Sequence, residues 1–417
     1  MPFTVLVAPS GFKESLDVQV VTEAIVAGVR RAAPQVRILA VPMFDGGDGF
    51  TQSLLRITGG TRHSVWVTGP LGDPVEAEFG MLKESPLRTA VVELASAAGL
   101  RLIPPHLRYP ERSTSRGVGE LISAALDAGA QRILVGCGDS GVHDGGAGML
   151  RALGFRLLDW RGDDLRAGGA ALADLTTIDA SGRDPRLNAA IFEACVNGQN
   201  MLLGPHGVSR IFGPQKGANA EQVHQLDRAL TNYAARIEEA TGCDVANVAG
   251  SGASGGVGAA LHAFLGATLT PRYDFVSQFV SVDDLLDQAD LVITAEGCID
   301  QQTCRGKIPG EIARRAKVRG CPVIVLAGSI GEGANEAYAC GVDAFVSILD
   351  QPVQFEEAAE QARRLLEQCT ENVVRILCAG HMIGAAAQHK QNGRSEERPL
   401  KSAARTRRLG DTQTVGN

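Results

Sequence analysis

Residues 3–34 read FTVLVAPSGFKESLDVQVVTEAIVAGVRRAAP, and this stretch holds a complete strand, loop and helix. Val5–Ala8 are wholly apolar, which predicts a buried strand. A loop follows, and Asp17 stands where the N-cap of a helix is expected. The apolar residues beyond it recur on one helical face up to Pro34: Val18, Val21, Ile25 and Val29. The stretch therefore predicts the first strand–helix unit of a parallel sheet.

The same alternation of short apolar strands and amphipathic helices continues along the chain. Strands are predicted at 36–41, 89–94, 132–136, 290–295, 322–327 and 343–348. Helices are predicted at about 117–129, 145–153, 221–240, 257–265, 309–318 and 355–378. This alternation is typical of an α/β fold, whose parallel sheets bind ligands at the carboxyl ends of their strands.

Length and charge narrow the class of protein. The chain has 417 residues, more than one hydrophobic core ordinarily supports, so two domains are expected. Its net charge is −7 and it has no basic stripe, which argues against nucleic acid as a partner. No apolar run approaches the roughly 20 residues that cross a bilayer, and residues 3–8 lack the basic flank of a signal peptide. A cytoplasmic enzyme without a membrane partner is expected.

Cysteine usage and the C-terminal composition give two further expectations. The nine cysteines are dispersed and form no CxxC pair. Cys298 and Cys304 are the closest in sequence, and all nine are predicted to be reduced thiols rather than a disulfide or zinc framework. From His389 the chain becomes polar and basic, which predicts a disordered tail over 389–417. A nucleic-acid-binding arm is the less favoured alternative for this tail.

Two loops near the N-terminus combine glycine with charge. Gly11 opens the turn after the first strand, and Lys13 follows near a helix N-terminus, where an anion is favoured. A solvated surface lysine is the alternative. Asp45 and Asp48 stand among three glycines after the next strand, and carboxylate oxygens suit Mg²⁺. Both could instead cap the following helix, and capping explains Asp48 better than Asp45.

Residues 136–141, GCGDSG, spell the dinucleotide-binding pattern G-x-G-x-x-G. Asp139 would put a negative charge where pyrophosphate should lie, and the next helix begins late, after Gly146. A dinucleotide site is therefore not favoured here. His143 in the same loop is interpreted as a surface hydrogen-bonding residue rather than a catalytic acid or base.

Two later loops are also rich in glycine or polar groups. Residues 250–256, GSGASGG, precede a helix and either cradle an anion or allow close helix packing. Residues 294–303, TAEGCIDQQT, follow an apolar strand and bring together Glu296 and Asp300, with Lys307 just beyond. Local capping does not explain so many polar groups in one turn. No G-x-x-x-x-G-K-[ST] motif occurs, so any nucleotide must be held differently.

Six segments in this order resemble the bacterial glycerate kinase family of the two-domain α/β type. They are FKESL at 12–16, DGG at 45–47, TGPLG at 68–72, DGGAG at 144–148, FGPQKGA at 212–218 and EGCIDQQT at 296–303. The resemblance extends from about residue 3 to about residue 385, which is nearly everything except the tail.

The resemblance implies two α/β domains. One would be a Rossmann-like (flavodoxin-like) parallel sheet built from 1–75 and 285–385, with a second mixed α/β domain, 76–284, inserted in it. It also implies a kinase that uses ATP and Mg²⁺ to phosphorylate a small hydroxy acid, D-glycerate, typically to 2-phosphoglycerate. The resemblance leaves a homodimer open.

Phosphoryl transfer depends mainly on positioning and charge neutralisation, and the loops supply groups for both. The resemblance implies catalytic roles for Lys13, Asp45, Glu296 and Asp300, and Mg²⁺ ligation by Asp45, Asp48 and Asp300. Nucleotide contacts are expected from Gly11, Gly252, Gly255 and Lys307. Substrate contacts are expected from Arg116, Asp144 and Lys216.

The chain departs from the family pattern inside these loops. Ser10 and Gly11 replace a segment with an acid, Asp139 replaces a glycine, His143 an asparagine and Cys298 an arginine; Arg116 is new, and 197–201 exchanges two acids for amides. The acids at 45, 144, 296 and 300 remain, which favours an active kinase. Three alternatives stay open: a kinase for a related hydroxy acid, with Arg116 and His143 reshaping its pocket, a catalytically silent ligand-binding paralog, and, least favoured, a dinucleotide oxidoreductase.

Overall fold

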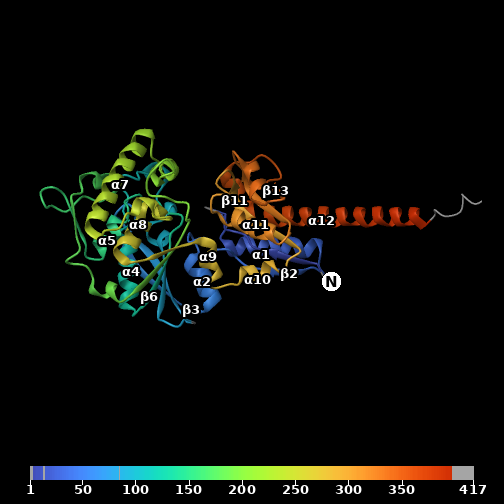
Figure 1. Cartoon of the computed structure of the whole chain (residues 1–417), viewed down its shortest axis with the longest axis horizontal. Helices are drawn as coiled ribbons and strands as arrows, with labels where there is room; N and C mark the ends of the chain where they lie inside the picture. The colour runs from blue at the N-terminus through green and yellow to red at the C-terminus, as the bar shows by residue number, and fades with distance from the viewer. Residues whose placement is uncertain (1–2, 13–14, 84, 397–417) are drawn as a thin grey trace, which may run out of the picture.

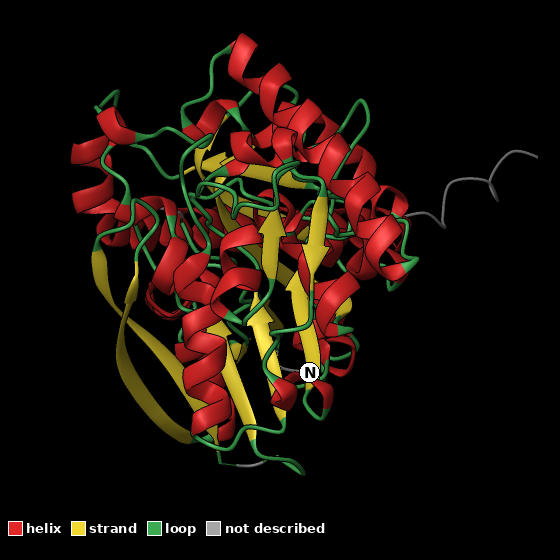
Figure 2. Cartoon of the chain, turned by 90° about the vertical axis from the view of Figure 1, so that its left-hand side faces the viewer, coloured by secondary structure: helices red, strands yellow, loops and turns green. Residues whose placement is uncertain are grey.

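The computed structural model describes residues 3–12, 15–83 and 85–396, with side chains described as far as residue 383. Lys13, predicted above to be catalytic, lies outside the described residues. The chain folds into two lobes, with helix α9 (Arg272–Ser277) between them and helix α10 (Val282–Leu286) beside the lobe that holds the N-terminus (Figure 1). Figure 2, in which one lobe lies in front of the other, shows helices packed around most of the strands.

One lobe is built on a parallel sheet made from the two ends of the chain. Its strand order is β13–β12–β11–β1–β2, and every neighbouring pair is parallel. The strands are β1 (Thr4–Val7), β2 (Arg37–Ala40), β11 (Leu291–Ile299), β12 (Val323–Ile330) and β13 (Ala344–Ser347). All five were expected from sequence, because buried parallel strands form short apolar runs.

Helices cover both faces of this sheet. Val5 and Val7 pack toward α1 (Val18–Ala32) and α12 (Phe355–Glu396), whereas Leu6 packs toward α11 (Ile308–Val318). Asp17 caps α1 as predicted, accepting hydrogen bonds from two backbone N–H groups. A Cβ on Gly28 would lie 2.6 Å from Glu367 O, so glycine permits the close approach of α1 and α12.

Helix α12 is longer than the sequence predicted. It continues to Glu396 and projects from the body of the molecule (Figure 1), so the tail predicted from residue 389 begins too early. The segment after 383 is rich in alanine and glutamine, which favour helix without needing an apolar face to bury. Residues 397–417 of the predicted tail lie outside the described residues.

The other lobe is built on a mixed sheet with the order β10–β9–β6–β5–β4–β3. Its strands are β3 (Gly60–Thr68), β4 (Pro74–Leu82), β5 (Thr89–Glu93), β6 (Arg132–Gly136), β9 (Ile191–Val196) and β10 (Thr268–Pro271). Strands β3, β4 and β5 pair antiparallel and the others parallel. The strands that the sequence missed are the β3–β4 hairpin, β9 and β10. A small hairpin, β7 (Arg156–Leu158) and β8 (Thr177–Asp179), lies outside this sheet.

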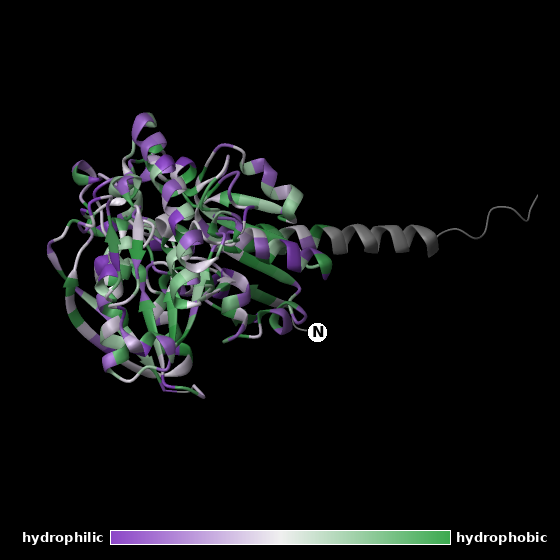
Figure 3. Ribbon diagram, turned by 60° about the vertical axis from the view of Figure 1, so that its left-hand side comes forward, coloured by the Kyte–Doolittle hydropathy of each residue, from purple (hydrophilic) through white to green (hydrophobic). Residues whose placement is uncertain are grey.

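Helices of the mixed-sheet lobe enclose its main core. They are α3 (Leu94–Ala98), α4 (Arg116–Asp127), α5 (Ala147–Ala152), α6 (Val208–Phe212), α7 (Ala220–Thr241) and α8 (Ala253–Leu265). Short 3-10 turns in this lobe occupy Leu100–Leu102, Pro105–Leu107, Gly169–Asp174, Pro185–Asn188, Pro214–Lys216 and Val245–Asn247. A further one, Ala334–Cys340, lies between β12 and β13 in the parallel-sheet lobe. Figure 3 shows the apolar residues concentrated in the interior strands. No helix in the described part of the chain is long and apolar enough to span a membrane.

The apolar cluster that contains Leu6 and residues of α11 also joins the two lobes. Phe50 of α2 (Phe50–Thr58) and Phe275 of α9 pack together with Leu6 of the parallel sheet and Leu134 of the mixed sheet. The chain changes sheets between β2 and β3 and returns between β10 and β11. We therefore propose two domains that divide there, with the first boundary before β3 rather than at residue 75.

One cysteine expectation is wrong. Cys304 and Cys340 form a disulfide, although they are 36 residues apart in the chain. They meet because β11 and β12 are neighbours, which brings the segments that follow these two strands together. Sequence spacing carries no signal of this contact. Cys298 and the other described cysteines are free, as expected.

Candidate active site

The loops of the two sheets meet at the carboxyl ends of their strands. A Cβ on Gly138, after β6, would lie 2.5 Å from Gly47 N, after β2. A Cβ on Gly46 would lie 2.9 Å from Cys195 O at the end of β9. Side chains at these positions would force the loops apart. The glycines of both motifs therefore serve the contact between the lobes.

Asp139 stands at the centre of this contact. Its φ is +45°, an uncommon conformation for a residue with a side chain, and its Oδ2 accepts a hydrogen bond from Asp48 N at 3.1 Å. Helix α5 begins only at Ala147, well beyond the G-x-G-x-x-G pattern. The loop therefore lacks the helix start that a dinucleotide fingerprint requires, as predicted.

Asp45 and Asp48 both face arginines across the junction. Asp48 Oδ1 lies 2.8 Å from Arg101 Nε, and Asp45 Oδ2 lies 3.6 Å from Arg272 Nη1. Burial raises the pKa of Asp48, while its hydrogen bond to Arg101 opposes this shift. The capping alternative is wrong, because the N-cap of α2 is Gly49 rather than Asp45 or Asp48.

Glu93 is buried at the carboxyl end of β5, close to the Asp48 loop. Burial raises its pKa from an ordinary 4.5 to about 7, although its Oε2 accepts a hydrogen bond from Thr51 N at 3.1 Å. Folding thus favours the protonated form. The contribution of this carboxyl group to stability is fully present below pH 4.5 and is lost as the pH rises through about 7.

Glu93→Gln is therefore expected to raise the melting temperature more at about pH 8 than at about pH 5. Glutamine stays neutral at both values and keeps an oxygen that can accept from Thr51 N. Thermal unfolding of both proteins across this range measures the difference. A melting-temperature difference that stays constant with pH would contradict the raised pKa.

The end of β11 and the loop that follows it, residues 296–307 (here called the β11 loop), bring three of the predicted residues together. Lys307 Nζ lies 3.0 Å from Asp300 Oδ1 and 3.3 Å from Glu296 Oε2, and it donates to Cys298 O at 3.2 Å. Glu296 also accepts from Thr303 Oγ1 at 2.7 Å. Burial raises the pKa of Glu296, and the positive charge of Lys307 partly offsets this. The loop thus holds one cation between two carboxylates.

The first loop lies beside this cluster. Ser10 donates from both its backbone N and its Oγ to Ala295 O, each at 2.9 Å, so it is held against the residue before Glu296. A Cβ on Gly11 would lie 3.3 Å from Leu16 O and from Val18 N, which leaves little room for a side chain. The role of Gly11 in nucleotide binding stays a prediction.

The mixed-sheet lobe reaches the β11 loop through the segment after β9. Asn197 Nδ2 donates to Arg305 O at 3.2 Å, and a Cβ on Gly306 would lie 2.5 Å from Asn197 Oδ1. The amide that replaces a family acid in this segment therefore forms a direct contact between the lobes.

A cleft of about 270 Å³ opens where the loops converge. Four cationic side chains border it: Arg101, Arg108, Lys216 and Arg272. Its acidic residues are Asp48 and Asp139, so positive charge predominates and an anion is favoured. The sequence predicted only Lys216 among the four cations, because the arginines come from separate segments without a motif.

Lys216 is buried at the wall of this cleft, with Nζ donating to Ser140 Oγ at 3.0 Å and to Val142 O at 2.6 Å. His143 is buried as well, with Nε2 2.9 Å from Ser209 Oγ, so its interpretation as a surface residue is wrong. Burial, aided by the charge of Lys216, holds the pKa of His143 well below its usual range. This histidine is therefore neutral at ordinary pH.

The glycine-rich loop before α8 packs tightly on its neighbours. A Cβ on Gly252 would lie 2.2 Å from Met201 O, and one on Gly255 would lie 2.3 Å from Val142 O. Close packing, one of the two interpretations of this loop, is thus what these glycines allow. Gly255 also borders the cleft, whereas the nucleotide-binding role of both glycines stays a prediction.

Two predicted substrate residues lie away from this cleft. Arg116 pairs with Glu120 at 2.9 Å and borders a second cavity of about 350 Å³, beside Arg151 and Thr68. Asp144 is buried and borders neither cavity. It accepts four hydrogen bonds, from Ser115 N, Ser115 Oγ, Gly146 N and Gly148 N. The substrate role of Arg116 stays a prediction, and the contacts of Asp144 indicate a structural role.

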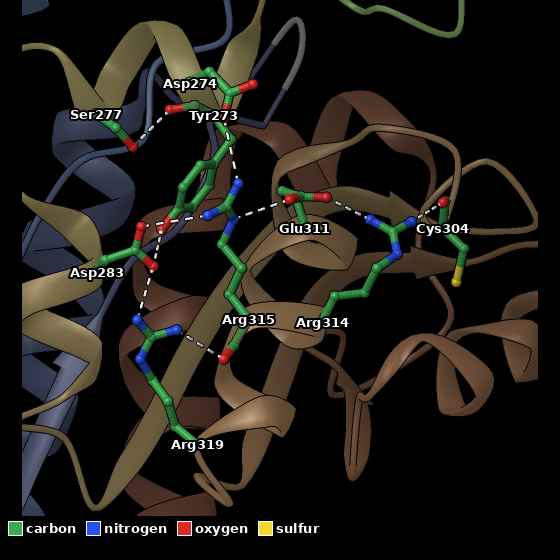
Figure 4. Close-up of polar contacts among 9 residues, drawn as sticks. All are labelled: Tyr273, Asp274, Ser277, Asp283, Cys304, Glu311, Arg314, Arg315 and Arg319. Carbon is green, nitrogen blue, oxygen red and sulfur yellow. Dashed lines mark hydrogen bonds and ion pairs between the residues drawn. The ribbon is translucent and has the colours of Figure 1, made fainter.

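An ion-pair network joins α9 to α11 (Figure 4). The Arg315 guanidinium lies 3.9 Å from the centre of the Tyr273 ring and also pairs with Glu311 at 3.0 Å and Asp283 at 3.3 Å. Arg314 donates to the carbonyl oxygen of Cys304, in the β11 loop. The network therefore fixes Arg272, the residue before Tyr273, relative to the Glu296–Asp300–Lys307 cluster.

Known proteins resemble this chain over nearly its whole length. A model of the glycerate kinase family matches residues 5–378. Glycerate kinase from Bacillus subtilis (strain 168) is 44% identical over 369 residues, which is 88% of this chain and 96% of that protein. Glycerate 2-kinase from Escherichia coli (strain K12) is 41% identical over 376 residues, which is 90% of this chain and 98% of that protein.

A solved structure shows the same relationship. A crystal structure from Salmonella typhimurium LT2, assigned as a glycerate kinase 2, superposes with a TM-score of 0.71 and 42% identity. The similarity covers 92% of this chain and 100% of that one. Sequence and fold agree, and the chain belongs to the glycerate kinase family.

Proposed function

We propose that this protein, a small-molecule kinase, transfers the γ-phosphoryl group of ATP to D-glycerate and yields 2-phosphoglycerate. The observation that carries the proposal is the cationic cleft, which lies where the loops of the two sheets meet. The names of the relatives, glycerate kinase and glycerate 2-kinase, point to the same substrate and product.

The size of the cleft favours the acceptor acid as its occupant. Its volume of about 270 Å³ is below the roughly 300–1,000 Å³ of sites that enclose drug-sized ligands. A three-carbon acid fits such a space, whereas a whole nucleotide does not. We therefore place the phosphates of ATP over the β1 and β11 loops, where Lys307 supplies positive charge. Phosphoryl transfer needs such neutralisation of the transferred group.

The carboxylates present are compatible with Mg²⁺ that arrives with the nucleotide. In the described part of the chain no group of three acidic, histidine or cysteine side chains could enclose a metal ion. Mg²⁺ in kinases commonly takes only one or two carboxylates, with water and substrate phosphates as further ligands. Asp45, Asp48 and Asp300, each of which also faces a cationic side chain, are the acids that would hold it. When bound, the ion neutralises charge on the phosphate oxygens.

A coupled ADP-release assay with Mg·ATP tests this function across a panel of small hydroxy acids. Turnover on D-glycerate, with 2-phosphoglycerate identified by ³¹P NMR, is the expected result. Turnover only on another acid would assign a different substrate. No turnover, together with thermal stabilisation by a hydroxy acid, would instead show a catalytically silent ligand-binding paralog.

A further inference from the structure

Two buried polar atoms at the cleft have no hydrogen-bond partner among the described residues. They are Ser254 Oγ and Arg272 Nε. Both residues border the cleft, from different elements: Ser254 at the start of α8 and Arg272 at the start of α9. Buried polar atoms are nearly always hydrogen-bonded, so two exceptions at one cleft require an explanation.

Ser254 is held in a conformation that residues other than glycine seldom adopt. Its φ and ψ are 53° and 43°, and Gly255 and Gly256 after it also have positive φ. The chain cannot relax easily here, because Gly255 is packed against Val142 O. Backbone strain of this kind persists where the surroundings fix it, and it gathers at ligand-binding sites. The Ser254 hydroxyl is therefore held in a fixed position at the cleft wall.

Arg272 is similarly fixed but incompletely paired. Its Nη1 lies 3.6 Å from Asp45 Oδ2, which is too long for a hydrogen bond, and its Nε has no partner among the described residues. The next residue, Tyr273, is held by the Arg315 guanidinium stacked against its ring in the network of Figure 4. A positioned guanidinium with an unused donor in a cationic cleft suits an anionic oxygen.

We propose that Arg272 Nε and Ser254 Oγ together bind the carboxylate group of the acceptor acid. This inference rests on the proposed kinase function and names the residues that select its substrate class. A carboxylate offers two acceptor oxygens, enough for both donors. A neutral polyol would leave the Arg272 donor buried and unpaired, so the pair selects hydroxy acids over polyols.

Steady-state kinetics and calorimetric binding of D-glycerate, measured on the full chain, test the assignment. Arg272→Met should raise the KM for D-glycerate roughly 10- to 100-fold, because it removes a hydrogen bond to a charged group. Ser254→Ala and Ser254→Gly should each raise it roughly 5- to 20-fold, with the KM for ATP unchanged. Equal effects of alanine and glycine would assign the loss to the hydroxyl, since only glycine relieves the strained φ. Arg62→Met removes an exposed arginine of β3 and is the matched control.

Comparison with glycerol, a neutral acceptor, separates carboxylate recognition from general damage. The ratio of kcat/KM for D-glycerate to that for glycerol should fall in Arg272→Met and stay constant in Arg62→Met. An unchanged KM and an unchanged D-glycerate affinity in all three cleft variants of an active kinase would overturn the inference. If the wild-type protein shows no turnover, the proposed function fails, and calorimetry still decides the inference. Binding that weakens in the variants supports the carboxylate site, and equal binding or none overturns it.

Discussion

On the proposed function, Asp300→Asn is expected to lower kcat roughly 100- to 1,000-fold while the fold stays intact, because the carboxylate proposed to hold Mg²⁺ or to orient the attacking hydroxyl is lost. The substitution keeps the shape of the side chain. It also keeps an oxygen that can accept from Gln302 N, as Oδ1 of Asp300 does at 2.7 Å. Lys307 retains Glu296 as an ionic partner at 3.3 Å. The structural consequences should therefore be small, and the loss should fall on catalysis.

The kinetic pattern distinguishes this role from general destabilisation. If Asp300 helps to hold Mg²⁺, the variant should also need more Mg²⁺ for half-maximal activity. Asp284→Asn, an exposed acid in α10, is the matched control and should keep wild-type activity. Steady-state assays over a range of Mg²⁺ and a melting curve for each protein give the measurements. A fully active Asp300→Asn protein would remove this residue from the proposed site.

The cluster around Asp300 was accessible from sequence because it is local. Glu296 lies near the end of β11, Asp300 directly follows that strand and Lys307 stands just before α11, and the structure brings all three within ion-pairing distance. Their agreement with the family pattern adds to this local signal. The parallel sheet was predictable for a similar reason, since each buried strand carries its own apolar run.

The cationic cleft could not be predicted in the same way. Arg101 and Arg108 follow α3, and Arg272 follows β10, more than 150 residues further along the chain. Only the folded chain brings them together, and an isolated arginine in a sequence normally indicates solvated surface. The β3–β4 hairpin was missed because β3 is largely exposed and polar, whereas in β4 Glu76 and Glu78 interrupt the apolar residues, so neither strand is a continuous apolar run.

Asp144 shows how a family motif identifies a residue without showing what it does. The motif DGGAG led to a substrate-binding role, whereas the carboxylate is buried and accepts hydrogen bonds from four protein donors. These bonds tie the start of α5 to the start of α4 through Ser115 and Gly148. An acid kept for this reason would resemble an acid kept for catalysis in a comparison of sequences alone.

Asp144→Ala is consequently expected to lower the free energy of unfolding by about 3–5 kcal/mol, because it leaves several buried donors unpaired. Asp159→Ala is the matched control, since Asp159 Oδ1 also accepts from two backbone N–H groups, of Arg161 and Asp163, but in an exposed turn. Its expected loss is below about 1 kcal/mol. Urea unfolding of the three proteins measures both values.

Asp144→Asn separates the hydrogen bonds of this carboxylate from its charge. Burial raises the pKa of Asp144 despite its four donors, so the fold disfavours the charge itself. A neutral amide removes that penalty and keeps one acceptor oxygen, so asparagine should destabilise the protein less than alanine does. A stable Asp144→Ala protein with a raised KM for D-glycerate would reverse this conclusion and restore a role in substrate binding. If alanine destabilises the protein more than asparagine does, the role of Asp144 is structural. Its hydrogen bonds would then join the starts of α4 and α5 and so hold the loops of the site in place.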